Sequence, residues 1–97
     1  MIITAMELCT SNLTQRTAQI CEVACKTGSS NMDWPAMSMA SYPEGWFMAV
    51  PERQYIMASE LPEDLFDVLI YARDLGVNLI RFDRDAEPDT NLPTYDW

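Results

Sequence analysis

The side chains of this chain that could do chemistry are mainly carboxylates. The sequence holds fifteen aspartates and glutamates, three cysteines and no histidine. Without histidine, the commonest general base is missing and a mixed cysteine and histidine zinc site cannot form. Many acids are available for a catalytic pair, but no pair stands out by its spacing. We therefore expect a protein that is not an enzyme.

The three cysteines are an odd set, Cys9, Cys21 and Cys25, without a Cys-x-x-Cys pair. This predicts free thiols in a reducing compartment. Cys21 and Cys25 would share a face of a helix and could form a soft-metal or redox pair, although thiols in an apolar stripe more often pack in a core. Cys9 could have a lowered pKa beside a helix start, but without a histidine its expected role is also packing.

Acids alternate along the segment after residue 82, at positions 83, 85, 87 and 89. Oxygen ligands at alternating positions resemble half of a calcium loop. An EF-hand loop also has a central glycine and a closing glutamate, and residues 83–94 have neither at the required positions. We therefore expect no metal site and no cofactor.

Charge is distributed unevenly along the chain. The formal net charge is −9, and residues 60–97 contain ten acids against three arginines, a net of −7. Such a chain repels phosphate, which disfavours direct binding of nucleic acid. Tyr42, Trp46 and Phe47 on expected strands could stack on single-stranded bases, but strand alternation places some of them in the core and no basic RNA-binding signature accompanies them.

Hydrophobic periodicity and turn residues predict six elements. Thr14 can cap a first helix that ends before Gly28, and a second helix lies between Pro62 and Gly76. Pro43 and Gly45 favour a type I turn between two strands. The expected elements are strand 2–9, helix 14–26, strand 37–42, strand 46–50, helix 62–75 and strand 77–83, with a loop over 28–34.

This order is that of the ferredoxin-like βαββαβ fold. We expect an α+β protein with a four-stranded antiparallel sheet and two helices on one face. The length suits one domain, residues 1–97. The first residues lack a basic region, and no apolar run approaches a membrane span, which predicts a cytoplasmic protein. Leu92, Tyr95 and Trp97 could fold back on the domain, or Trp97 could contact a partner.

Five segments carry a resemblance to a known group of proteins. They are Gly45-Trp46-Phe47 with Val50-Pro51, Leu61-Pro62-Glu63-Asp64-Leu65, Ala72-Arg73-Asp74-Leu75-Gly76, Asp83-Arg84-Asp85 and the closing Asn91-Leu92-Pro93-Thr94-Tyr95-Asp96-Trp97. Together they resemble a family of short uncharacterised proteins carried by phages, plasmids and integrated elements. The resemblance implies a mobile-element origin and a recurrent end motif. The family usually has a histidine at the position that Asn12 occupies here, and this departure argues against histidine-based chemistry.

The acidic C-terminal part suggests a protein-binding function. Carboxylates at spacings comparable to those of phosphates could occupy a basic groove on another protein. The hypothesis is an inhibitor from a mobile element, an anti-CRISPR type of protein that mimics DNA and blocks a CRISPR effector or restriction enzyme in the host cytoplasm. The expected partner-binding residues are Glu63, Asp64, Asp67, Asp74, Asp83, Asp85, Glu87 and Asp89.

Two alternatives remain open. The acids could form a solvated face that serves solubility alone. The protein could instead be an adaptor that binds partners through an apolar surface rich in tryptophan and methionine. The methionines around the expected hairpin and its loops are Met32, Met37, Met39, Met48 and Met57. Raising the salt concentration should weaken an acidic contact and spare an apolar one.

Overall fold

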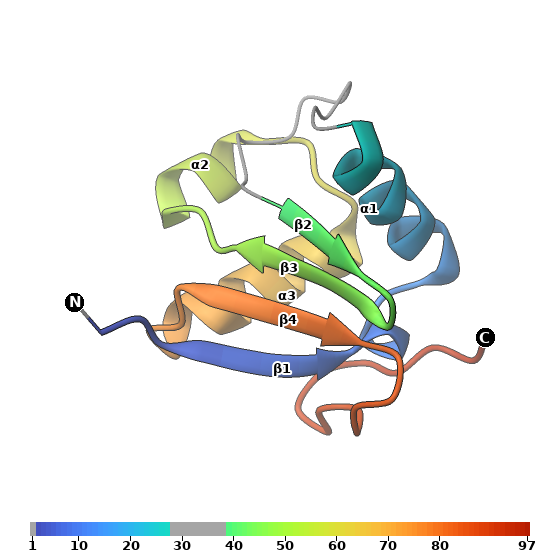
Figure 1. Cartoon of the computed structure of the whole chain (residues 1–97). Coiled ribbons are helices and arrows are strands. Elements are labelled where there is room, and N and C mark those ends of the chain that lie inside the picture. The colour runs from blue at the N-terminus through green and yellow to red at the C-terminus, as the bar shows by residue number, and fades with distance from the viewer. Residues whose placement is uncertain (1, 28–38) are drawn as a thin grey trace.

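The computed structural model describes residues 2–27 and 39–97 and shows helices packed around a four-stranded sheet (Figure 1). The polypeptide forms a mixed α+β fold in this part of the chain. The elements in order are β1 (Ala5–Cys9), the 3-10 turn η1 (Thr10–Asn12), α1 (Gln15–Thr27), β2 (Met39–Tyr42), β3 (Gly45–Ala49), α2 (Arg53–Ala58), α3 (Glu63–Asp74) and β4 (Leu79–Asp83).

The strand order in the sheet is β1-β4-β3-β2. Strand β1 pairs with β4 in parallel, and the β4–β3 and β3–β2 pairs are antiparallel. The prediction of an antiparallel sheet is therefore wrong, and the ferredoxin-like topology is not confirmed. Leu8 and Phe82 are paired residues and both are buried. Because alternation of buried and exposed residues is the same in both pairing types, the sequence pattern does not reveal the strand direction.

The β2–β3 hairpin confirms the predicted turn. Tyr42 pairs with Gly45, which leaves Pro43 and Glu44 as a two-residue loop. Gly45 is needed there, because a Cβ atom at this position would lie 1.8 Å from the carbonyl oxygen of Phe82 on β4. The expected loop over 28–34, Gly28 and the first residues of the strand predicted from Met37 lie outside the described residues.

Both long helices begin close to their predicted positions. The backbone N–H of Thr17 donates to Oγ1 of Thr14 at 3.3 Å, as expected of a helix cap. Helix α3 ends before Gly76, whose φ of +75° is a conformation that favours glycine. The short helix α2 was not predicted, and its Ile56 is fully buried.

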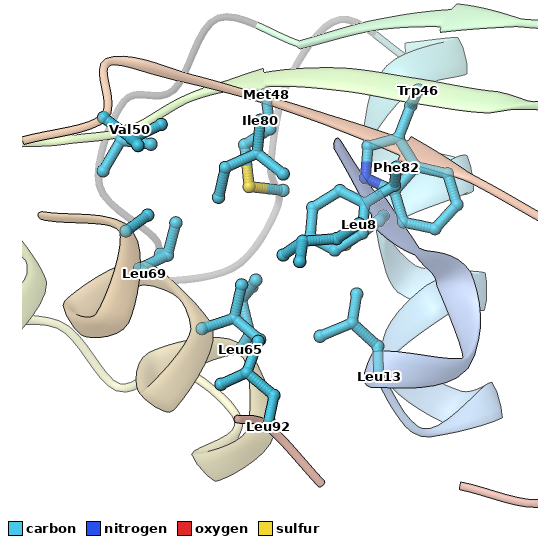
Figure 2. Close-up of a cluster of buried hydrophobic side chains, with 14 of the residues drawn as sticks. Leu8, Leu13, Trp46, Met48, Val50, Leu65, Leu69, Ile80, Phe82 and Leu92 are labelled. Carbon is cyan, nitrogen blue, oxygen red and sulfur yellow. The ribbon is translucent and has the colours of Figure 1, made fainter. Parts of the chain in front are cut away.

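The core lies on one face of the sheet (Figure 2). The indole ring of Trp46 stacks on the ring of Phe82 with centroids 5.2 Å apart. All three α-helices contribute buried side chains to the same cluster. The fully buried members include Leu8, Leu13, Cys21, Met48, Ile56, Leu65, Leu69, Ile80 and Phe82. No helix in the described ranges is long and apolar enough to cross a bilayer.

Candidate acidic surface and cleft

The eight acids expected to bind a partner fall into two sets. Four carboxylates, those of Asp64, Asp74, Asp83 and Asp89, accept hydrogen bonds or form an ion pair inside the protein. The other four have no such partner among the described side chains, and all four residues are exposed. We call this second set the acidic surface, and it consists of Glu63, Asp67, Asp85 and Glu87.

Asp64 joins the first turn of α3 to the start of α1. Its Oδ2 accepts the backbone N–H of Thr14 at 2.8 Å and the Thr14 hydroxyl at 3.1 Å. Its Oδ1 accepts the hydroxyl of Thr17 at 2.9 Å. A carboxylate at this point satisfies an unpaired N–H group and complements the positive end of the α1 dipole. Asp64 is therefore a structural residue.

Asp89 and Asn12 hold the chain that follows β4 against η1. The backbone N–H of Asp89 donates to Oδ1 of Asn12 at 3.0 Å, and Nδ2 of Asn12 donates to the carbonyls of Asp89 and Pro93 at 3.2 and 3.0 Å. The Asp89 carboxylate accepts the hydroxyl of Tyr71 at 3.0 Å and the N–H of Asn91 at 2.8 Å. The Asn12 side chain is buried, so the polar groups of this loop are satisfied internally.

Asp83 and Asp74 also have internal roles. Asp83 accepts the hydroxyl of Tyr42 at 2.8 Å and the N–H of Asp85 at 2.8 Å, and these two hydrogen bonds, the backbone one first, lower the pKa of its carboxyl. Burial, the hydrogen bond to Asp83 and nearby carboxylates raise the pKa of Tyr42 to about 12. Asp74 forms an ion pair with Arg53 at the surface, where such pairs contribute little to stability.

The acids of the two predicted regions lie on adjoining segments. The hydrogen bond from Tyr71 on α3 to Asp89 places the chain after β4 beside this helix. Burial and then the charges of Asp64, Asp67 and Glu63 raise the pKa of Tyr95. The start of α3 therefore lies near Tyr95, and Asp89 lies beside Tyr71 of the same helix.

The C-terminal segment packs on the domain, which is one of the two alternatives that the sequence left open. Leu92 is buried, and the N–H of Tyr95 donates to the carbonyl of Ser11 at 2.8 Å. Nε1 of Trp97 donates to the carbonyl of Leu13 at 2.8 Å, yet the residue stays 49% exposed. The indole ring is thus held in place and remains accessible.

A cleft of about 440 Å³ lies between the β2–β3 turn, α1 and Trp97. Its charged side chains are Glu22, Glu44 and Arg84. Sequence reasoning did not identify this site, because its walls come from five separate segments and no local motif connects them. The residues that line it are Thr10, Glu22, Ser41, Tyr42, Pro43, Glu44, Gly45, Trp46, Arg84 and Trp97.

The cysteines have the packing role that was expected. Burial, and then the negative charges around it, raise the pKa of the Cys21 thiol far above its ordinary value. Burial and the charge of Glu22 also raise the pKa of Cys25. Cys9 is buried and accepts the hydroxyl of Ser11 at 3.1 Å. Among the described residues no group of three or more cysteines and acids could hold a metal ion.

The aromatic and methionine side chains are divided between core and surface. Trp46 and Met48 are buried, whereas Met57 is exposed. Phe47 and Tyr42 lie on the face of the sheet opposite the core, with ring centroids 5.1 Å apart. Met32 and Met37 lie outside the described residues.

These features define a small α+β domain with an acidic exterior and a mixed, partly aromatic cleft. Residues 5–97 match the model of a family described as "Family of unknown function (DUF5983) C-terminal domain". The match covers nearly the whole chain, and the protein belongs to this family. No curated protein and no solved structure matches the chain.

Proposed function

We propose that this protein binds a basic surface of a nucleic-acid-binding protein through its acidic surface. The observation that carries the proposal is the set of four exposed carboxylates, two at the start of α3 and two after β4, that have no internal partner among the described side chains. Carboxylates that are not needed for folding are available to a partner, and a net charge of −9 favours encounter with a basic one.

The specific form of this proposal is inhibition by mimicry of DNA. A lysine- and arginine-lined channel that normally holds a phosphate backbone would accept carboxylates in its place. Together with the mobile-element resemblance, this points to a host defence complex, such as a CRISPR effector or a restriction enzyme, as the target. In this proposal the protein acts in the host cytoplasm and performs no catalysis.

The test uses pairs of isosteric substitutions that each remove two charges. The variants are Glu63→Gln with Asp67→Asn, and Asp85→Asn with Glu87→Gln. The matched control is Glu52→Gln with Glu60→Gln, since both residues are exposed and neither carboxylate has an internal partner in the described part of the chain. Tagged protein is used to capture partners from a host lysate at low and high salt, and mass spectrometry identifies them.

We expect a nucleic-acid-binding complex that is captured at low salt and released at high salt. Double-stranded DNA should compete with the protein for the purified complex, and both acidic-surface variants should bind more weakly than the control variant. If all three variants lose binding to the complex equally, the net charge of the protein attracts the partner and no defined surface is involved. Capture of the partner that persists at high salt, and that is the same for all three variants as for the unmodified protein, would refute the proposal.

The alternative function is an adaptor that binds through apolar side chains. The observation in its favour is the exposure of Tyr55 and Met57 on α2, at 56% and 61%. Of the methionines in the described ranges, however, Met57 alone is exposed, so an extended methionine surface has little support. Salt-resistant capture that is lost in a Tyr55→Ser, Met57→Ser variant would favour the adaptor.

A further inference from the structure

The cleft beside Trp97 combines two kinds of group that recognise an organic cation, carboxylates and an aromatic ring. The carboxylates of Glu22 and Glu44 line it from α1 and from the β2–β3 turn. Neither forms an ion pair with a described side chain. Trp97 adds an aromatic ring, and tryptophan is the best side chain for cation–π contact.

The walls of the cleft are fixed before any ligand arrives. The backbone N–H of Arg84 donates to the carbonyl of Glu44 at 2.9 Å, which joins the turn to the end of β4. The hydrogen bond from Nε1 of Trp97 to the carbonyl of Leu13 holds the indole, although about half of the residue's surface is exposed. A rigid, accessible tryptophan at the edge of a cavity loses little entropy on binding and is typical of an interface anchor.

The electrostatic balance of the cleft favours a positive ligand. The lining includes two carboxylates and a single guanidinium, that of Arg84, so its side chains carry a formal charge of −1. The carboxylates of Asp83 and Asp85 flank Arg84 in the sequence. Burial, the hydrogen bond to Asp83 and the charges of Asp83, Glu44 and Asp85 raise the pKa of Tyr42, which also lines the cleft.

We propose that this cleft receives one arginine or lysine side chain of the basic partner, with its cationic group against Trp97 and the carboxylates of Glu22 and Glu44. The inference rests on the proposed function and makes the cleft its anchor point. A partner with a basic groove carries many such side chains, and a volume of about 440 Å³ lies in the range of small-ligand sites.

The test is an NMR titration of the whole protein with a minimal probe. N-acetyl-arginine amide carries the cation, and N-acetyl-citrulline amide is an uncharged control of nearly the same shape. We expect the indole N–H signal of Trp97 to shift with saturation in the arginine titration and to respond little to citrulline. Equal responses to the two probes, or no saturable shift with either, would overturn the inference.

Substitutions in the cleft test the sign of the charge. Glu22→Gln with Glu44→Gln should weaken binding of the arginine probe by roughly fivefold, whereas Glu52→Gln with Glu60→Gln should leave it unchanged. Arg84→Gln removes the competing cation and should strengthen binding. Weaker binding in Arg84→Gln, with saturable binding of N-acetylglycine by the unmodified protein, would identify an anion site and refute the inference.

The same variants distinguish this inference from the proposed function. If partner capture depends on the acidic surface but not on Glu22 and Glu44, the proposed function stands, and the inference that the cleft anchors the partner is wrong. If the arginine probe binds as expected but no basic partner is captured, the cleft stands as a site and the proposed function fails.

Discussion

Removal of the Asp64 carboxylate should cost a large part of the stability of this domain. In Asp64→Ala, α1 loses three hydrogen bonds to a charged acceptor, two from Thr14 and one from Thr17. Hydrogen bonds to charged groups contribute about 1.5–3 kcal/mol each. Water can replace part of the loss because Asp64 is only partly buried, and Thr14 still caps Thr17. We therefore expect a loss of about 2–4 kcal/mol, above the usual effect of a single cap.

The control for this prediction is Asp67→Ala, one turn further along the same helix. Asp67 is exposed and its carboxylate has no hydrogen-bond partner among the described residues. The substitution removes the same charge, and its effect should stay within about 0.5 kcal/mol. Urea unfolding followed by tryptophan fluorescence gives both free energies of unfolding, with similar slopes expected. If the two variants lose equal stability, the hydrogen bonds of Asp64 do not stabilise α1 as the structure indicates.

Two further predictions concern Gly45 and Tyr42. Gly45→Ala places a Cβ atom 1.8 Å from the Phe82 carbonyl oxygen, so the two strands must move apart. Urea unfolding should show that the free energy of unfolding falls by about 1–3 kcal/mol or more. Unchanged stability would contradict this close approach. Tyr42, with its pKa raised to about 12, should be the last tyrosine to ionise in an absorbance titration. An unfolded tyrosine ionises near pH 10, so the folded state binds more protons between about pH 10 and 12 and stability should fall as the pH rises through this window. Tyr42→Phe should reduce this loss of stability at high pH. An equal loss in the variant and in the unmodified protein would refute the assignment of the raised pKa to Tyr42.

Elements with local signals were predictable from the sequence. Pro43 and Gly45 determine the hairpin, and Pro62 and Gly76 bound α3, because proline and glycine restrict the backbone whatever the rest of the chain does. The parallel pairing of β1 with β4 has no local signal, since Thr4 and Asn78 meet across 74 residues. Short α2 also escaped prediction, because six residues carry too little periodicity.

The candidate site was predictable only in part. Composition identified the acidic C-terminal region, but not which acids are engaged. Asp64 meets Thr14 across 50 residues and Asp89 meets Asn12 across 77, and partners at such separations cannot be assigned from one sequence. A variant that reversed the charge of Asp83 together with Asp85 and Glu87 would also remove the carboxylate that accepts the Tyr42 hydroxyl. A clean test of the surface therefore leaves Asp83 intact.

The position of β4 in the sheet has a consequence for how the protein is made. It lies between β1 and β3, yet it is the last strand to leave the ribosome. Until it emerges, β1 has no neighbour to pair with and the β2–β3 hairpin is a ribbon of only two strands, which is marginally stable in water. Pairing at such long sequence separation is also slow. We therefore expect the four-stranded sheet to form only after β4 has left the ribosome.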